Sequence, residues 1–257
     1  MARPYAAPVS EPPSPASRSR RPPPDLRPVV VVRVADRTPR LRRLTLGGPA
    51  LVGFPAAAPA ASVRLLPPTD GVVELPTWNG NEWRFADGTR PPIRTLTPVR
   101  IATDPPGDPE VDVDVVLHGA GPLSSWAASV QPGAPAALAG VGQGYELDPE
   151  ATHLVLAGDE SALPAIEQLL GTVPDHVTIQ VVVELAAPDG RLELPAHPGA
   201  SVVWCEDLVP AVLALELPDD ARVWAAGNAA EVQRLRKHLF DQRGLPRTHC
   251  VIRGYWK

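Results

Sequence analysis

The chain has 257 residues, of which 44% are hydrophobic, and a formal net charge of −5. This length suits two domains that each bury a core. No apolar run approaches the roughly 20 residues of a membrane span, the N-terminus lacks the apolar block of a secretory signal, and the negative charge disfavours nucleic acid. We therefore expect a cytoplasmic monomer that binds neither membrane nor nucleic acid.

Residues 1–27 are rich in proline and poor in large apolar side chains, so we expect a disordered tail. A weaker alternative is a proline-rich docking segment. From residue 28 to 146, short β-type runs separated by turn residues predict a small antiparallel barrel. Its expected strands cover residues 29–34, 40–46, 62–66, 82–85, 93–101, 111–117 and 136–140. A helix is expected from Gly121-Pro122 to about Val130, because proline suits a first helical turn.

Residues 147–257 alternate between strand-like and helix-like segments, which predicts a parallel sheet with helices on its faces. The expected elements cover residues 153–157, 162–170, 177–184, 201–205, 207–215, 221–226, 229–240 and 248–254. Ligands of such sheets bind at the carboxyl ends of the strands, here residues 158–161 and 227–228. Cys205 and Cys250, the only cysteines, are too few for a disulfide framework or a thiolate metal cluster, and we expect reduced thiols and no metal site.

Four segments carry more specific information: residues 94–100 (RTLTPVR), 117–127 (LHGAGPLSSWA), 157–166 (AGDESALPAI), and the pair 225–228 (AAGN) and 253–257 (RGYWK). In this order and spacing they resemble the signatures of the FAD-binding siderophore-interacting proteins, over about residues 29–257. The resemblance implies a ferredoxin-reductase-like fold: an FAD-binding antiparallel β-barrel at residues 28–146, then a parallel-sheet NAD(P)H-binding domain at 147–257. It implies a reductase that passes electrons from NADH or NADPH through FAD to a ferric siderophore.

The first motif is assigned to the flavin site by this resemblance. Arg94 can hold the FAD pyrophosphate in two-point contact, because guanidinium is planar and permanently charged; an exposed strand arginine is the alternative. Thr95 lies beside it, and Thr97 is expected near flavin N5, where a hydroxyl can tune hydride acceptance. Leu96 departs from the family, which usually has tyrosine there. Leucine can neither stack on a ring nor hydrogen-bond to it, so we predict weakened or differently tuned flavin binding.

The second motif places glycines and a hydroxyl at a helix start, where free N–H groups suit a phosphate. An ordinary strand-turn-helix junction is the alternative. By resemblance, its FAD-binding residues are His118, Gly119, Gly121, Ser124 and Trp126.

The third motif follows an apolar strand and opens a helix, as expected near a dinucleotide. The expected NAD(P)H-binding residues are Gly158, Asp159, Glu160, Ser161, Ala162 and Gly227. Asp159 and Glu160 have a plainer interpretation as favourable charges at a helix N-terminus. Glu184 ends the next strand and can disfavour a 2′-phosphate, but Arg191 is close in sequence, which leaves NADH and NADPH open.

Arg64 and Lys257 are candidate contacts for the ferric siderophore, with a solvated surface charge as the alternative, and for Arg40, Arg42 and Arg43 that alternative is favoured. No convincing Ser/His/Asp or paired-carboxylate arrangement is visible, so no catalytic side chain is predicted and the flavin carries the chemistry. Two other functions fit the pattern: a reductase of free flavin, quinone or a partner redox protein, and a flavin-poor siderophore-binding or regulatory homologue.

Overall fold

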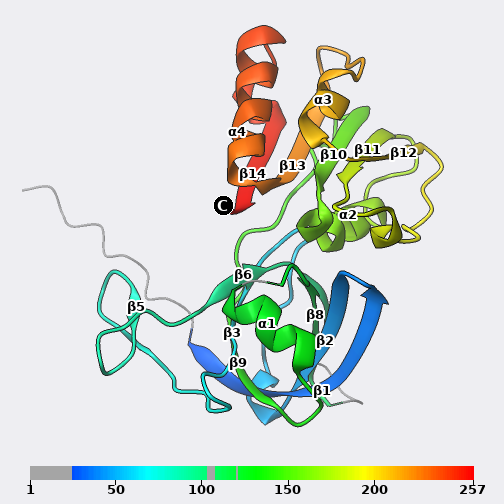
Figure 1. Cartoon of the computed structure of the whole chain (residues 1–257). Helices are drawn as coiled ribbons and strands as arrows, with labels where there is room; N and C mark the ends of the chain where they lie inside the picture. Colours follow the sequence, from blue (N-terminus) through cyan, green and yellow to red (C-terminus); the bar gives the residue numbers. More distant parts are fainter. Residues whose placement is uncertain (1–24, 103–107, 120) are drawn as a thin grey trace, which may run out of the picture.

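The computed structural model of the chain describes residues 25–102, 108–119 and 121–257 (Figure 1). The N-terminal half forms a curved sheet with the strand order β6-β3-β9-β1-β2-β8-β7. Its strands are β1 (Leu26–Thr38), β2 (Leu41–Gly47), β3 (Val63–Leu66), β6 (Arg94–Leu96), β7 (Pro98–Ala102), β8 (Glu110–Val116) and β9 (Pro135–Ala139). Each pair of neighbouring strands in this sheet is antiparallel, as expected for the barrel. Strand β1 begins at Leu26, which pairs with Ala139, so the disordered tail expected over residues 1–27 is wrong at residues 26 and 27. Residues 1–24 of that expected tail lie outside the described residues.

Strand β8 shows how the sequence pattern forms this layer. Its alternate residues Val111, Val113 and Val115 are buried in the barrel core, because successive side chains of a strand point to opposite faces. The intervening acidic residues lie on the other face, where Asp114 accepts two hydrogen bonds from Arg43. The predicted helix is present as α1 (Pro122–Ser129), and it packs its Leu123 against this barrel core.

The C-terminal half is a five-stranded parallel sheet with the order β12-β11-β10-β13-β14. Its strands are β10 (His153–Asp159), β11 (Thr178–Glu184), β12 (Ala200–Cys205), β13 (Arg222–Asn228) and β14 (Cys250–Trp256). Its α-helices are α2 (Leu163–Leu170), α3 (Leu208–Leu213) and α4 (Ala229–Lys237). Helix α2 covers the face that carries Leu154, and α3 and α4 cover the face that carries Val155, so the predicted layers are confirmed. No helix in the described ranges is long and apolar enough to cross a membrane.

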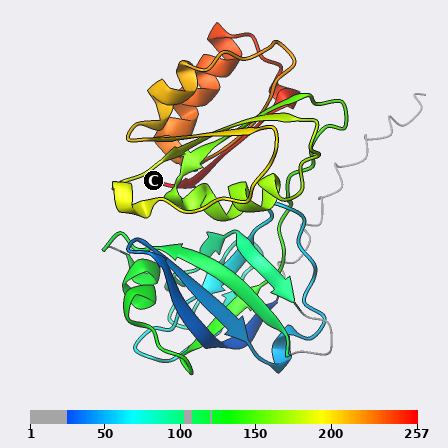
Figure 2. The same cartoon turned by 90° about the vertical axis from the view of Figure 1, so that its right-hand side faces the viewer.

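The tip of the β1–β2 hairpin joins the two halves, and Figure 2 shows α2 at the boundary between them. Arg37 at this tip donates two hydrogen bonds of 2.7 Å to Glu167 of α2. Arg40 pairs with Glu160, which follows β10, at 2.9 Å. Leu41 is buried in the same hydrophobic cluster as the residues of α2. The interface therefore combines apolar packing with two half-buried ion pairs.

The expectation that Arg40, Arg42 and Arg43 are solvated surface charges is therefore wrong. Their side chains are only 29%, 17% and 27% exposed, and each pairs with a carboxylate. The partners lie up to 120 residues away in the sequence, so local composition does not reveal them.

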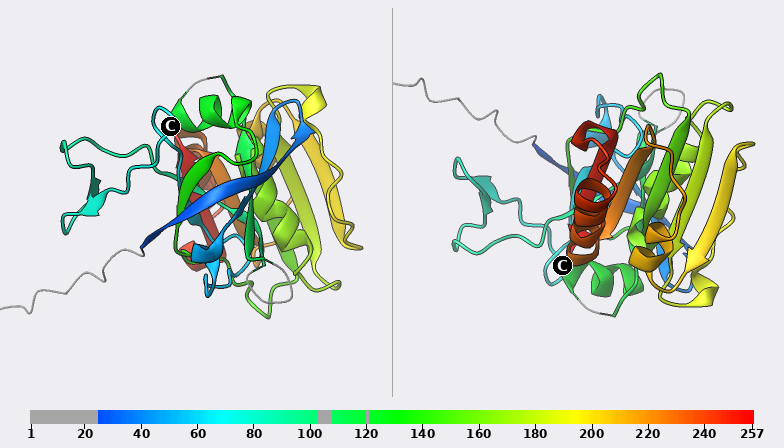
Figure 3. Two further views of the ribbon diagram at one scale, coloured as in Figure 1. Left: turned by 90° about the horizontal axis from the view of Figure 1, so that it is seen from below. Right: turned by 90° about the horizontal axis from the view of Figure 1, so that it is seen from above.

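The segment between β3 and β6 leaves the barrel, and Figure 3 shows it extending away from the body of the molecule. It contains a short hairpin of β4 (Thr77–Trp78) and β5 (Trp83–Arg84), whose two tryptophan rings meet edge to face at 5.6 Å. The expected barrel strand at 82–85 is therefore wrong, since β5 pairs only with β4.

Candidate functional site

The barrel is open where β6 and β7 diverge. These strands are consecutive in sequence, but β6 pairs with β3 and β7 pairs with β8, so they lie at opposite margins of the sheet. The single strand expected at 93–101 is therefore wrong. The chain breaks at Thr97, next to Pro98, which has no N–H to continue a ladder.

The predicted flavin residues of the first motif line this margin in different ways. Arg94 is exposed, and among the described residues its guanidinium donates only to the carbonyl oxygen of Ile93, at 3.0 Å. Thr95 is exposed, and Leu96 is half-buried against the barrel core. Thr97 is 5% exposed, and its hydroxyl lowers the pKa of the Tyr255 phenol, against the larger raising effect of burial. Arg94 is therefore the group of this segment that is free to bind an anion.

The second motif forms the turn before α1. Gly119 and Gly121 have φ values of +73° and +80°, which favour glycine because a Cβ strains this backbone. Helix α1 has no side-chain cap. A Cβ at Gly119 would meet nothing within 4 Å, so the turn borders open space. Uncapped N–H groups beside open space suit a phosphate.

The remaining residues of the second motif hold the turn in place. Ser124 is 3% exposed, and its hydroxyl accepts a hydrogen bond from the His118 N–H at 3.0 Å. The His118 side chain is exposed, and Trp126 is half-buried against the barrel core. Leu96 packs against the barrel-core cluster that contains Leu123, so the first two motifs contribute to the same core. An exposed guanidinium and a helix start without a side-chain cap each suit an anionic dinucleotide.

The third motif differs from the other two, because both of its carboxylates already have hydrogen-bond partners within the protein. Asp159 is 7% exposed and accepts four hydrogen bonds. Its Oδ1 accepts from the Ser161 N–H at 2.8 Å and the Ser161 hydroxyl at 2.5 Å, and its Oδ2 accepts from the Asn228 N–H at 3.0 Å and the Trp256 indole at 2.7 Å. Glu160 is also 7% exposed and is held by Arg40. These two acids thus tie together β10, β13, β14 and the barrel domain.

The glycines of the C-terminal half are required by close packing. A Cβ on Gly158 would lie 2.4 Å from both the Ala162 Cβ and the Ala226 carbonyl oxygen. A Cβ on Gly227, whose φ is +152°, would lie 2.6 Å from Asp159 Oδ2. Because these two glycines have no side chain, the ends of β10 and β13 and the buried Asp159 carboxylate can lie close together.

A further group of acidic residues surrounds this edge, and the motifs do not reveal it. Burial raises the pKa of Glu184 and Glu231 above the usual value, and the charges of Asp159 and Asp207 raise both further. Arg234 opposes the shift in both residues. The signal in the sequence is that β10, β11 and β12 each end in or are followed by a carboxylate. Within the described residues, no group of three or more His, Cys, Asp or Glu side chains could hold a metal ion.

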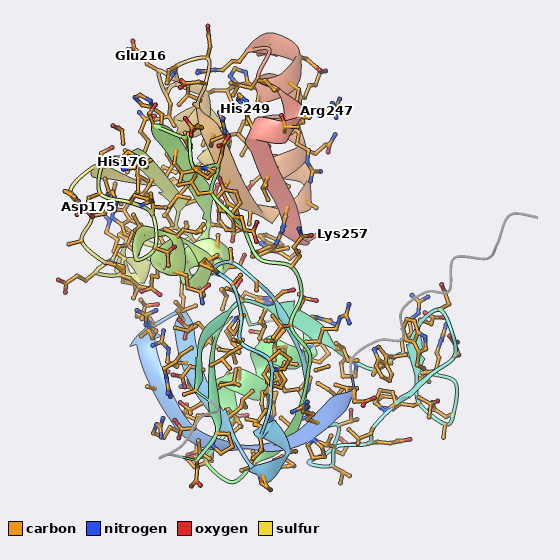
Figure 4. All side chains as sticks on the ribbon, turned by 180° about the vertical axis from the view of Figure 1, so that it is seen from behind. Asp175, His176, Glu216, Arg247, His249 and Lys257 are labelled. Atoms are coloured by element: carbon orange, nitrogen blue, oxygen red, sulfur yellow. The ribbon has the colours of Figure 1, made fainter. Side chains whose placement is uncertain are left out.

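The candidate substrate contacts lie at the surface. Arg64 is exposed in β3, directly opposite Thr95 in the β3–β6 ladder. Lys257 follows β14, at the end of the parallel sheet that faces the barrel (Figure 4). Glu216 lies at the far end of the same domain.

Comparison with known proteins identifies the family of the chain. A model described as the siderophore-interacting FAD-binding domain matches residues 30–144, and one described as the siderophore-interacting protein matches residues 151–257. An uncharacterized protein of Mycobacterium tuberculosis is 35% identical over 197 residues, covering 67% of this chain and 69% of that protein. The ferric vibriobactin reductase ViuB of Vibrio cholerae is 28% identical over 233 residues and 84% of each chain.

Solved structures give the same result for the fold. The crystal structure of a siderophore utilization protein from T. fusca has a TM-score of 0.78 and 29% identity, over 91% of this chain and 94% of that one. The ferredoxin reductase in carbazole 1,9a-dioxygenase has a TM-score of 0.64 over 90% of this chain and 69% of that one, and at 14% identity it shows the fold alone. The expected ferredoxin-reductase-like fold is confirmed.

Proposed function

Because this chain belongs to the siderophore-interacting protein family, whose first domain binds FAD, we propose that it is an NAD(P)H-dependent ferric-siderophore reductase. Its role is associated with flavin and siderophores. The finer proposal is that electrons pass from NADH or NADPH through FAD to the ferric chelate. We also propose that the protein acts as a cytoplasmic monomer.

Two observations carry the proposal: a free guanidinium at the open barrel margin, and a helix start without a side-chain cap. Arg94 has no carboxylate partner among the described residues, and the N-terminus of α1 has no side-chain cap. Together they would hold the two phosphates of FAD. Leu96 would lie against the flavin ring, and Thr97, which interacts with Tyr255, would lie at its edge.

The bound flavin supplies the conversion of a two-electron hydride into single-electron steps. The chain's own contribution is to position the partners. The carboxyl edge of the parallel sheet presents the dinucleotide, and Arg64 and Lys257 offer positive charge to an anionic chelate. Each NAD(P)H carries two electrons, and each iron(III) accepts one, so two ferric chelates are consumed per donor. Iron(II) is a softer ion than iron(III), binds oxygen donors less tightly, and leaves.

The test is an anaerobic reaction of the FAD-loaded protein with NADH or NADPH, followed by a ferric siderophore and an iron(II) trap. We expect bleaching of the flavin band by the nucleotide, then its recovery with about two iron(II) per nucleotide oxidised. Flavin reduction without iron(II) would contradict the siderophore assignment and favour a general flavin or quinone reductase.

The visible spectrum separates this reductase from a flavin-poor binding protein, the alternative that Leu96 raises. A reductase shows a flavin band as purified or after addition of FAD. A colourless protein that FAD cannot reconstitute, but that still binds a ferric siderophore, would contradict the enzyme and support a binding or regulatory role.

A further inference from the structure

Several carboxylates lie at the carboxyl edge of the parallel sheet. In the proposed reductase, the adenosine ribose of a bound nicotinamide dinucleotide would lie at this edge. Glu184 is the last residue of β11 and lies in register beside Asp159, the last residue of β10. In open α/β sheets the residue at the end of the second strand meets this ribose: a carboxylate hydrogen-bonds the 2′-hydroxyl of NAD, whereas an arginine accommodates the 2′-phosphate of NADP.

The geometry of Glu184 leaves one oxygen for such a contact. Its Oε2 accepts the Leu208 N–H, at the start of α3, at 2.7 Å, which fixes the carboxylate at the edge. No donor among the described residues reaches its Oε1. The side chain is half-buried, so a neighbouring phosphate is less screened than in bulk water.

The neighbours of Glu184 are also mostly acidic. Asp207 caps α3 by accepting the Val209 N–H at 3.3 Å, and Asp159 accepts its hydrogen bonds from uncharged donors. Glu231, in the first turn of α4, has a buried Oε2 without a partner in the described part of the chain. Among the described residues, Arg234 is the cation that lowers the pKa of both Glu184 and Glu231, and its Nη2 lies 3.8 Å from Glu231 Oε1. Four carboxylates against one guanidinium leave this edge strongly negative.

Resting on the proposed reductase function, we propose that the electron donor is NADH, and that Glu184 determines this specificity by accepting the ribose 2′-hydroxyl and repelling a 2′-phosphate. Asp207 and Glu231 reinforce the repulsion. A 2′-phosphate brings about two negative charges, each of which is repelled by a neighbouring carboxylate even at the dielectric constant of water. The expected discrimination against the phosphorylated nucleotide is therefore at least about tenfold.

The test compares ADP-ribose with 2′-phospho-ADP-ribose by titration calorimetry on the full chain, because these probes need no flavin chemistry. We expect ADP-ribose to bind at least about tenfold more tightly, and the ratio to shrink at high salt. Glu184→Gln, which keeps an oxygen for the Leu208 N–H, should narrow the ratio about tenfold, mainly by strengthening the phosphorylated probe. Asp207→Asn, which keeps an oxygen for the Val209 N–H, should narrow the ratio of the two affinities by a smaller factor.

Glu216→Gln is the matched control, since it makes the same change at the far end of the domain and should leave the ratio unaltered (Figure 4). Wild-type protein that binds 2′-phospho-ADP-ribose as tightly as ADP-ribose, or more tightly, would overturn the inference while leaving the reductase intact. An unaltered ratio in folded Glu184→Gln would overturn the role of Glu184. If neither probe binds and neither nucleotide bleaches the flavin, the proposed function itself fails.

Discussion

The glycines before α1 and those at the ends of β10 and β13 look alike in the sequence but have different surroundings. A Cβ on Gly119 would meet open space, and one on Gly121 would come no closer than 3.8 Å to His118. A Cβ on Gly158 or Gly227 would instead lie 2.4 to 2.6 Å from atoms of the protein. A glycine-rich turn therefore identifies a ligand site only where the space that the glycine leaves is not filled by the chain itself.

The largest expected effect concerns the end of β10, where the protein itself fills the space beside the glycines. Replacing Asp159 by alanine leaves the Asn228 N–H and the Trp256 indole without their acceptor at the junction of β10, β13 and β14. These hydrogen bonds and those from Ser161 are partly buried, and donors left unpaired cost up to about 1–3 kcal/mol each, so we expect a loss of about 3–5 kcal/mol in the free energy of unfolding, measured with urea. Asp175→Ala, at an exposed loop residue, is the control. A loss no larger than that of the control would contradict the role of Asp159.

Alanine at the two kinds of glycine tests the comparison directly. Gly158→Ala should destabilise the fold by about 1–3 kcal/mol, because the new Cβ collides with the Ala226 backbone, which cannot move aside as a side chain can. Gly119→Ala meets no atom and should cost only about 1 kcal/mol, for the positive φ. Thermal unfolding of both variants measures the difference. Equal losses would show that packing around Gly158 is looser than the structure indicates.

Arg94 provides a test of the proposed flavin site. Arg94→Gln removes the charge that we propose for the FAD phosphates, so the dissociation constant of FAD should rise about 10- to 100-fold. The free energy of unfolding of the flavin-free protein should change little, because within the described residues the guanidinium bonds only to Ile93. Arg90→Gln, at another exposed arginine, in the projecting segment, is the matched control for flavin titration. An unchanged affinity in Arg94→Gln would remove Arg94 from the flavin site.

A smaller effect is expected from restoring an aromatic residue at the barrel margin. Leu96→Tyr should tighten FAD binding about 2- to 10-fold, the range that aromatic contacts provide beyond burial. Leu96→Phe supplies the ring without the hydroxyl and separates the two contributions. Full FAD occupancy in the wild-type protein, together with an unchanged affinity in Leu96→Tyr, would show that leucine does not weaken binding.

The smallest effect concerns the acidic edge. The pKa of Glu184 is raised in the folded state, first by burial and then by its acidic neighbours, so the folded protein binds more protons than the unfolded chain above the unfolded pKa. This contribution to stability is present at low pH and is lost as pH rises through the folded pKa. Compared with the wild-type protein, Glu184→Gln should therefore gain one or two degrees more in melting temperature at pH 7 than at pH 4. This corresponds to about 0.5 kcal/mol in the free energy of unfolding. A larger gain in melting temperature at pH 4 than at pH 7 would show that the folded protein stabilises the charged form of this carboxylate.

The sequence determined the order of the domains, the class of each sheet, the helix that starts at Pro122, and the motifs that resemble one family. These features depend on local periodicity, on residues with restricted backbones such as proline and glycine, and on short segments in a fixed order. Apart from the strands expected at 82–85 and 93–101, the barrel strands and the parallel-sheet elements accordingly overlap the expected ranges.

Tertiary structure alone decided which polar residues remain free for a ligand. Arg94 and Arg40 are both arginines near the β-type segments, but Arg40 meets a carboxylate 120 residues away while Arg94 does not. Likewise, the break at Thr97 follows from two different pairing partners, β3 and β8, which local pattern cannot distinguish. Hydrogen bonds and charges act through space, so whether a side chain is satisfied depends on long-range packing that periodicity does not encode.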